Sequence, residues 1–364
     1  MKRIIRSYYM KKPLEEPNDL HKREIALESL EDNVYIRHLA FPYIDALYTY
    51  ITSVKTPLHL YYSSAIYSAP DANRMESKVW EGSELIFDID ADKYEGCNVK
   101  FWVCPSSGDI SLNEISTCPD GGRPSLYSPL PWLCIEKAWG ETLRLVDVLR
   151  EDFGYRRIKV YFSGNRGFHV KVIDPEILHL NREARRIIAD YLSCDGLDMR
   201  RVFPSHRNKT VFSVLEYGLR KRVLGVAEGR GLVKVQSITG LKNIRVVDLN
   251  DVESILKEIC INIDKVVTMD TSRLSRFGGS LNMKAGLRVT EMSLNKDVRD
   301  LSYEHFSPFR GKIKVRSKVT GKLDVLGAHL SLVKGDIYKL SAPIGLFLLI
   351  KDFVVPIELS ELGV

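Results

Sequence analysis

Residues 84–90 read Glu84-Leu85-Ile86-Phe87-Asp88-Ile89-Asp90, and this stretch decides the fold of the chain. Apolar and acidic residues alternate through its second half, a pattern typical of a β-strand. Side chains two positions apart on a strand leave the same face, so the Cβ atoms of Asp88 and Asp90 should lie about 7 Å apart. The other face carries Leu85, Phe87 and Ile89, and we therefore expect this strand to pack against a core.

Two carboxylates on one strand face can bind one or two divalent cations such as Mg²⁺. Residues 81–95 hold six acidic residues and one lysine, so the whole segment suits a cation. The alternative is an exposed edge strand whose acids meet only water. The apolar residues between the two aspartates favour the metal interpretation, because they fix the strand in place.

A second chemical motif lies in residues 158–172. Two alternating runs flank the loop Ser163-Gly164-Asn165-Arg166-Gly167, which predicts a β-hairpin. Glycines let backbone N–H groups approach an anion, and an arginine can bind phosphate oxygens with two hydrogen bonds. Ser163, Arg166 and His169 are therefore candidates for a phosphate site. An ordinary glycine hairpin with an exposed arginine is the alternative.

The remaining sequence predicts an α/β (α+β) fold, a mixed sheet core with flanking helices. Residues 136–151 have the apolar spacing of a helix, and residues 61–67 are rich in strand formers. The first 60 residues show apolar residues at mixed three- and four-residue spacing, and we expect helices there. A length of 364 residues is consistent with about two domains.

Three motifs, in this order, resemble the catalytic small subunit of the archaeal and eukaryotic type of DNA primase. They are the acidic strand at 84–92, the hairpin SGNRGFHV at 163–170, and a block at 263–287 that contains Arg276 and the run Ser280-Leu281-Asn282-Met283-Lys284. Fainter similarities at 23–24, 35–37 and 342–348 extend the resemblance over nearly the whole chain. It implies a catalytic core of residues 1–175 and 259–364, a zinc-binding insert at 97–138, and a mainly helical insert at 176–258.

The resemblance also implies roles for single residues. Asp88, Asp90 and Asp264 match the family's ligands for catalytic Mg²⁺ or Mn²⁺, and Asp270 is a rival for the third place. Residues that match the family's nucleotide-binding positions are Ser163, Arg166, His169, Arg276, Lys284 and, near the start, Arg37. In two places the chain departs from the family pattern. Asn165 stands where a second arginine is usual, and Asn282 stands where histidine is usual, so it can bind a nucleotide but cannot carry a proton.

The cysteines leave two interpretations open. Cys97, Cys104, Cys118 and Cys134 are separated by 6, 13 and 15 residues, which is not the close pairing of a common zinc knuckle. Spacing alone favours scattered thiols, whereas the resemblance implies a zinc module directly after the acidic strand. We expect Cys194 and Cys260 to be small buried apolar side chains.

The resemblance implies a nucleotidyltransferase that uses nucleoside triphosphates to make short primers on single-stranded DNA. The partner would be a large subunit that carries an iron–sulfur cluster. Residues 199–234 contain nine basic and two acidic residues, a candidate surface for the DNA template or merely a solvated face. Two other functions stay open: a related polymerase for end joining or translesion synthesis, and a non-catalytic, zinc-stabilised nucleic-acid-binding protein.

Composition indicates a soluble intracellular protein, with 45% hydrophobic and 27% charged residues. The longest apolar run near the C-terminus spans 344–350, far shorter than the roughly 20 residues of a membrane helix. The first twelve residues are basic and lack the apolar segment of a secretory signal. Six cysteines are too few for a disulfide scaffold. We therefore expect a cytoplasmic protein without a membrane segment.

Overall fold

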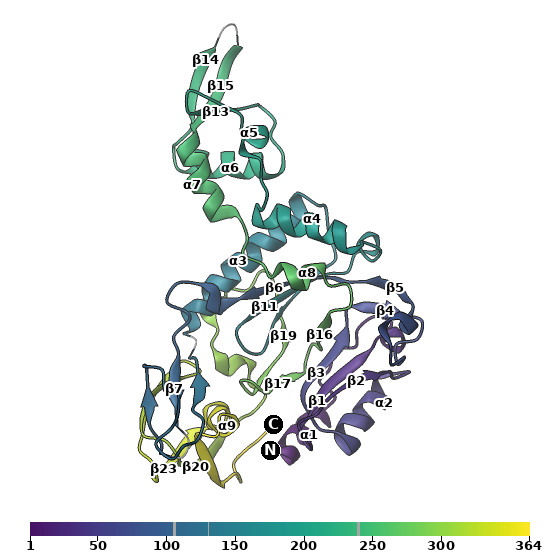
Figure 1. The fold of residues 1–364 in the computed structure, drawn as a ribbon, viewed down its shortest axis with the longest axis vertical. Coiled ribbons are helices and arrows are strands. Elements are labelled where there is room, and N and C mark those ends of the chain that lie inside the picture. Colours follow the sequence, from purple (N-terminus) through teal and green to yellow (C-terminus); the bar gives the residue numbers. More distant parts are fainter. Residues whose placement is uncertain (105–106, 130, 239–240) are drawn as a thin grey trace.

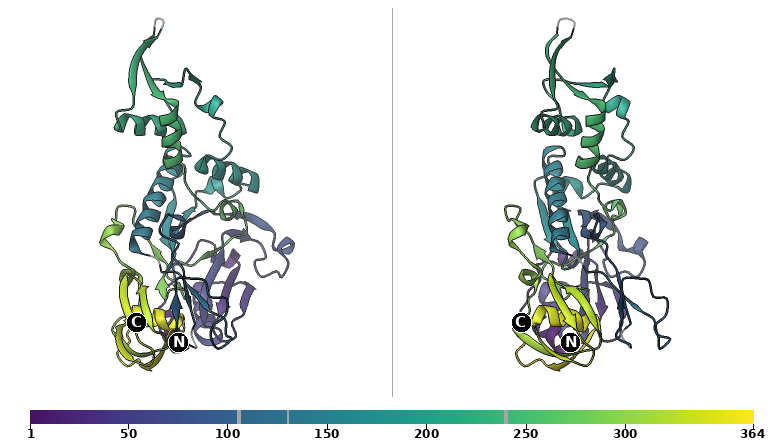
Figure 2. Two further views of the ribbon diagram at one scale, coloured as in Figure 1. Left: turned by 60° about the vertical axis from the view of Figure 1, so that its left-hand side comes forward. Right: turned by 90° about the vertical axis from the view of Figure 1, so that its left-hand side faces the viewer.

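The computed structural model describes residues 1–104, 107–129, 131–238 and 241–364. Figure 1 shows a broad lower body made of both ends of the chain and a narrower arm that rises above it. The arm extends away from the body in both views of Figure 2 as well. Within the described residues, no helix combines the length and apolar character that crossing a membrane requires.

The predicted acidic strand is β6 (Leu85–Asp90), and it forms one edge of a four-stranded sheet. Its neighbour is β11 (Gly167–Val172), which forms the predicted hairpin with β10 (Ile158–Phe162), and β19 (Thr290–Glu291) completes the order β19-β10-β11-β6. All three pairings are antiparallel. The register sets His169 opposite Asp88 and Gly167 opposite Asp90, so the two chemical motifs share one edge of one sheet.

Helix α3 (Trp132–Glu151) covers the apolar face of this sheet. Its Trp139 ring packs against Phe168 of β11, with the ring centroids 5.1 Å apart. Phe87 and Ile89 of β6 are buried on the same side of the sheet. This burial leaves the opposite face, which carries Asp88 and Asp90, for the functional site.

A second four-stranded sheet, in the order β16-β3-β1-β2, is built from segments expected to be partly helical. Its strands are β1 (Ile25–Ser29), β2 (Tyr35–Leu39), β3 (Pro57–Ser63) and β16 (Leu274–Arg276). The expectation of helices through the first 60 residues was therefore wrong for most of that region. The α-helices there are α1 (Lys2–Tyr9) and α2 (Ile44–Thr49), together with a 3-10 turn at Leu20–Lys22 and a short π-helical turn after α2.

The two sheets meet at a buried lysine. Lys171 of β11 donates a hydrogen bond to the hydroxyl of Tyr62 at 2.7 Å and another to the carbonyl of Arg276 at 3.3 Å. Burial lowers the pKa of Lys171 to about 8, although the negative charge of Glu84 acts against this shift. Lys171 thus joins the polar face of the first sheet to strands β3 and β16 of the second.

The arm follows α4 (Arg182–Ser193) and contains both helices and a sheet. Its helices are α5 (Met199–Val202), α6 (Gly218–Gly229) and α7 (Leu249–Ile259). The sheet has the order β12-β13-β15-β14, from strands β12 (Ser205–His206), β13 (Lys209–Phe212), β14 (Lys234–Ile238) and β15 (Leu241–Asp248). The mainly helical insert expected at 176–258 therefore holds a four-stranded sheet, and it has a separate apolar cluster around Phe203, Phe212 and Val223.

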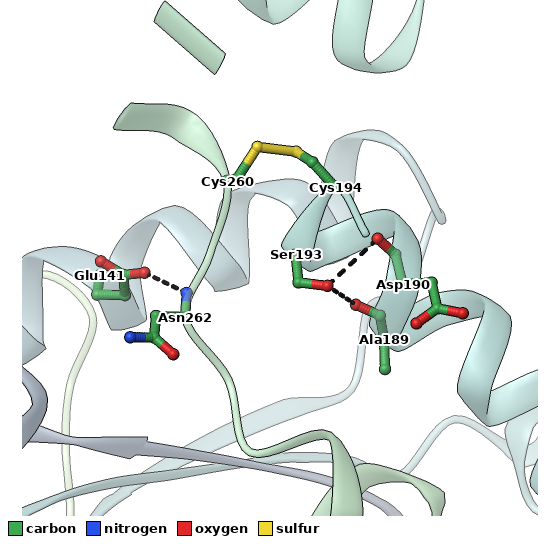
Figure 3. Close-up of a disulfide and its surroundings, with 7 residues drawn as sticks. All are labelled: Glu141, Ala189, Asp190, Ser193, Cys194, Cys260 and Asn262. Carbon is green, nitrogen blue, oxygen red and sulfur yellow. Dashed lines mark hydrogen bonds between the residues drawn. A yellow bond between two sulfur atoms is a disulfide. The ribbon is translucent and has the colours of Figure 1, made fainter. Parts of the chain in front are cut away.

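A disulfide between Cys194 and Cys260 joins the two chain segments where the arm leaves and re-enters the body (Figure 3). Cys194 follows the end of α4 and Cys260 follows the end of α7. Beside it, the carboxylate of Glu141 on α3 accepts a hydrogen bond from the backbone amide of Asn262 at 2.7 Å. The expectation of two free, buried thiols was wrong, because the fold brings these cysteines together across 66 residues.

The C-terminal region forms two small sheets around helix α9 (Ala342–Ile350). One contains β20 (Lys312–Ser317), β23 (Ile337–Ser341) and β24 (Val354–Glu358), and the other pairs β21 (Gly321–Val325) with β22 (Ala328–Leu332). The cysteine-bearing insert, with strands β7 (Phe101–Val103), β8 (Ile110–Ser111) and β9 (Ser125–Tyr127), lies beside it (Figure 1). The Tyr127 ring packs against Phe347 and Phe353, with centroids 5.9 and 5.7 Å apart.

The four cysteines of this insert form two disulfides, Cys97–Cys134 and Cys104–Cys118. The structure therefore differs from the expected site of four thiolates around one zinc ion. A sulfur bound to another sulfur carries no thiolate charge and is not a zinc ligand. In this arrangement the residues do not fit a zinc ion, and no group of three or more possible metal ligands occurs among the described residues.

Candidate active site

A cavity of about 300 Å³ opens on the polar face of the first sheet, next to strands β3 and β16 of the second. Its lining combines acidic and basic side chains with polar and apolar ones. The predicted site residues that it gathers are Asp88, Asp90, Ser163, Arg166, His169, Arg276, Asn282 and Lys284. Segments from residue 88 to residue 284 therefore converge on one space.

The two aspartates of β6 titrate differently because their surroundings differ. The carboxylate of Asp88 pairs with Nδ1 of His169. Burial alone would raise the pKa of Asp88, but the charge and hydrogen bond of His169 outweigh burial and leave this pKa below its usual value. Burial, together with the charge of Asp88, raises the pKa of Asp90. The pair thus concentrates negative charge that a cation at this point would relieve.

The carboxylate pair fits a magnesium-type ion. Mg²⁺ prefers oxygen ligands and is commonly bound by one or two carboxylates together with substrate phosphates. Asp88 and Asp90 both line the cavity, and basic side chains that could bind phosphates line it too. Buried Nε2 of His169 has no hydrogen-bond partner among the described residues, which leaves one more polar atom for a bound molecule.

The third expected metal ligand does not join this pair. The backbone of Asp264 lies next to that of Asp88, and its amide donates a hydrogen bond to the carbonyl of Asp88 at 3.3 Å. Its carboxylate, however, caps helix α8 (Lys265–Met269) by accepting from the amides of Val266 and Val267. The rival Asp270 accepts hydrogen bonds from the amide and hydroxyl of Ser272. Within the described part of the chain, Asp88 and Asp90 line the cavity as a pair of carboxylates, and no group of three possible metal ligands forms.

The shape of the hairpin loop requires glycine at two positions, Gly164 and Gly167. A Cβ atom on Gly167 would lie 2.0 Å from the carbonyl oxygen of Ile89, so only glycine allows β11 to approach β6 this closely. Gly164 has a φ of +72°, in the left-handed region that favours glycine. Arg166 is held by the carbonyl of Ser128 at 3.0 Å and by Asp92 at 3.4 Å, which leaves its guanidinium at the cavity wall.

Arg276 is fixed by a residue that sequence reasoning missed. Its guanidinium lies 4.9 Å from the ring centroid of Tyr61 and contacts Nδ1 of His59 at 3.0 Å. Burial and the charges of Arg276 and Lys284 lower the pKa of His59 to about 3, so its ring stays neutral and accepts from Arg276. A lone histidine between Leu58 and Leu60 gives no signal of this role in the sequence.

A model of the family described as DNA primase small subunit matches residues 140–294. DNA primase small subunit PriS of Staphylothermus marinus is 42% identical over 359 residues, covering 97% of this chain and 94% of the relative. The proteins of the same name from Sulfolobus acidocaldarius and Aeropyrum pernix are 36% and 34% identical, and each match covers 97% of this chain and 93% or 92% of the relative. The chain belongs to the DNA primase small subunit family.

Arg37, which the family resemblance suggested as a nucleotide-binding residue, lies outside the main cavity. Arg37 lines a neighbouring cavity of about 360 Å³, which shares Tyr61 and Arg273 with the main one. The buried carboxylate of Glu24 holds Arg37 through two hydrogen bonds, at 2.9 and 3.2 Å. Arg37 is therefore adjacent to the cavity that gathers the other predicted nucleotide-binding residues.

Most basic side chains of residues 199–234 form ion pairs with acidic side chains. Arg220 pairs with Glu216 at 2.7 Å and Arg222 pairs with Asp152 at 3.0 Å. Further pairs in this stretch are Arg201–Asp198, Lys221–Glu151, Arg230–Glu258 and Lys234–Asp248. The arm therefore presents much less free positive charge than its composition suggested.

Proposed function

We propose that this protein is the catalytic subunit of a DNA primase, which joins nucleoside triphosphates into a short primer on a single-stranded DNA template. One observation carries the proposal: a carboxylate pair and several cationic side chains line one cavity. A triphosphate that is attacked at its α-phosphate with the help of a divalent cation needs both kinds of group. Membership of the primase small subunit family supports the same conclusion.

The acidic residues of the cavity would bind the metal ion, and the basic residues would bind the triphosphate. Asp88 and Asp90 would hold Mg²⁺ or Mn²⁺, which supplies charge neutralisation at the phosphates and activation of the attacking 3′-hydroxyl. Arg166, Arg276 and Lys284 would bind the triphosphate chain, since charge-assisted hydrogen bonds to phosphate are among the strongest in proteins. Their fixed positions would orient the α-phosphate toward the carboxylates before reaction.

The hairpin would contribute its hydroxyl and imidazole beside these charges. Ser163 and His169 line the same cavity as the carboxylate pair. His169 is already paired with Asp88 through Nδ1, which leaves Nε2 to donate a hydrogen bond to a phosphate oxygen. Nucleotide position and metal position would thereby be coupled through one side chain.

The relatives are named small subunits, and this name supports a larger partner subunit for the present chain. We propose that the partner is the iron–sulfur large subunit expected from the resemblance, and that the complex acts on chromosomal DNA in the cytoplasm. The third metal ligand stays a proposal as well. The carboxylate of Asp264 would join Asp88 and Asp90 at the metal after releasing the backbone amides that it caps at the start of α8.

A primer synthesis assay tests the proposal. The protein is incubated with a polypyrimidine single strand, ATP, GTP and Mg²⁺ or Mn²⁺, with and without the large subunit. We expect new chains without any pre-existing 3′ end, and none with Asp88→Asn. Extension of annealed primers only would favour a related polymerase for end joining or translesion synthesis. DNA binding without nucleotide incorporation would favour a non-catalytic accessory protein.

A further inference from the structure

A smaller cavity, of about 60 Å³, adjoins the main one at its basic end. Asn165, Arg166 and Lys284 line both cavities, so the two spaces lie next to each other at these residues. The far side of the smaller cavity belongs to the C-terminal region and to the insert, through Phe347, Lys351 and Tyr127. A molecule that extends from the carboxylate pair past Arg166 and Lys284 therefore reaches this second space.

Lys351 is the residue in the smaller cavity that no motif identified. It is the C-cap of α9, and its backbone amide donates to the carbonyl of Phe347 at 3.0 Å. Its side chain is half-buried, with the ammonium 5.4 Å from the ring centroid of Phe347. Burial lowers the pKa of Lys351, and the positive charges of Arg166 and Lys284 lower it further.

Two of these cations, Lys284 and Lys351, lack a nearby counter-charge in the described part of the chain, whereas Arg166 pairs with Asp92. Among the described residues, neither Lys284 nor Lys351 forms an ion pair within 4.0 Å. The acid next in sequence, Asp352, pairs instead with Lys318 at 2.5 Å. Gathering like charges in a partly buried space costs free energy unless an anion binds there. Half-buried Arg166 and Lys351, beside exposed Lys284, therefore favour an anion at this place.

We propose that Lys351 binds the terminal phosphate of the incoming nucleoside triphosphate, so that the smaller cavity is the far end of the nucleotide site. This inference rests on the proposed function, because the direction of the triphosphate follows from placing its α-phosphate at Asp88 and Asp90. The terminal phosphate carries the most charge and lies farthest from the reacting bond. Pyrophosphate, which contains this phosphate after transfer, is a ligand of the same kind.

The test measures binding of ATP, ADP, AMP and pyrophosphate by calorimetry, with Mg²⁺, for the full-length wild type and Lys351→Ala. A lost charge-assisted contact should weaken binding of ATP and pyrophosphate roughly ten- to a hundredfold. AMP affinity should not change, and ADP should lose less than ATP. Lys351→Arg should restore most of the ATP affinity. Lys339→Ala, an exposed lysine paired with Glu361 in the same region, is the matched control and should bind like wild type.

Two further measurements separate the alternatives. If Lys351→Ala weakens binding of a single-stranded DNA oligomer and lowers its salt dependence while ATP binding stays normal, the cation contacts a nucleic-acid phosphate and the proposal is wrong. Unchanged ATP and DNA binding in a folded variant would show that the Lys351 side chain binds neither ligand, and this result would also overturn the proposal. Primer synthesis by the wild type is scored separately, so a failure of the proposed function leaves the ATP result interpretable.

Discussion

The side-chain amide of Asn282 donates a hydrogen bond to the backbone carbonyl of Ser163 at 2.9 Å and so joins two motifs that are 119 residues apart in the chain. Its carbonyl oxygen accepts from the amide of Lys284 at 3.2 Å. Asn282 is only 2% exposed, yet it also lines the main cavity. The residue that departs from the family pattern therefore positions both a hairpin carbonyl and the turn that carries Lys284.

Replacing Asn282 by alanine should reduce both stability and nucleotide affinity. The change leaves the buried carbonyl of Ser163 without its donor, which typically costs about 1–3 kcal/mol. Urea unfolding and ATP titration measure the two effects. Asn282→His should lose less of each, because an imidazole N–H can replace the amide donor. An alanine variant with wild-type stability and ATP binding would show that the bond to Ser163 contributes nothing.

Asp90→Asn should abolish nucleotide transfer without lowering the stability of the metal-free protein. Burial and the charge of Asp88 raise the pKa of Asp90, so its ionised form is disfavoured in the folded state. Because the folded pKa is above the unfolded one, the stability from this group is present at low pH and is lost as pH rises through the folded value. Asparagine removes that cost at neutral pH.

Thermal melting with and without Mg²⁺ checks this prediction. Wild type should gain stability with the ion, because a ligand that binds only the folded state raises its melting temperature. Asp90→Asn should gain much less, and the exposed turn residue Asp71 replaced by asparagine should behave like wild type. A normal rate of polymerisation in Asp90→Asn would exclude this carboxylate as a metal ligand.

Local sequence pattern was sufficient for the acidic strand and the hairpin. The strand expected at 84–90 is confirmed as β6, and the runs at 158–162 and 168–172 are confirmed within β10 and β11. Alternation is strict in β11 and in the second half of β6, and a glycine-containing loop separates β10 from β11, so local preference agrees with the final pairing. Which side chains share the cavity was indicated by the family resemblance rather than by local pattern.

Pairing between distant segments could not be predicted in the same way. Strands β1 and β2 have short apolar runs whose spacing also suits a helix. Their conformation is decided by the pairing of β1 with β3 on one side and with β2 on the other. The same is true of partners for single side chains. His59 contacts Arg276 across 217 residues, and Glu24 holds Arg37 outside the main cavity. Such contacts depend on the assembled sheets rather than on nearby sequence.

His59 should make stability depend on pH in a way that its replacement removes. Burial and two nearby cations lower its pKa to about 3, whereas the unfolded chain has an ordinary histidine value of about 6.5. Below the unfolded pKa only the unfolded state takes up the proton, so stability falls with decreasing pH. The loss from this group between pH 7 and pH 5 should be about 2 kcal/mol.

Urea unfolding of wild type and His59→Asn at both pH values measures the difference. The variant should lose less stability than wild type by about that amount, since the other titrating groups are common to both proteins. His59→Leu should in addition weaken ATP binding, because Arg276 loses the acceptor that fixes it. Equal pH dependence in wild type and His59→Asn would contradict a neutral, buried imidazole.

The disulfide at the base of the arm should stabilise the folded protein. A cross-link between residues 66 apart in the chain restricts the unfolded state by about 4 kcal/mol in the loop-entropy description. Cys194→Ser combined with Cys260→Ser should lower the free energy of unfolding by an amount of that order. Hydrogen exchange should increase most in α5, α6 and α7. Loss of stability without a change in the arm would argue that the bond acts on the body instead.

The insert cysteines provide a decisive comparison between disulfides and zinc. With all four paired as Cys97–Cys134 and Cys104–Cys118, protein purified without reductant should show no free thiols after denaturation and should contain no zinc. The measurements are thiol titration in denaturant and elemental analysis on the same sample. Cys104→Ser should then release one titratable thiol, from Cys118, and the variant should still contain no zinc. A sample with one zinc ion per chain and four free thiols would contradict these two disulfides and restore the zinc module that family resemblance implied. Because a disulfide sulfur is not a thiolate ligand, one sample whose four insert sulfurs all form disulfides cannot also hold zinc through them.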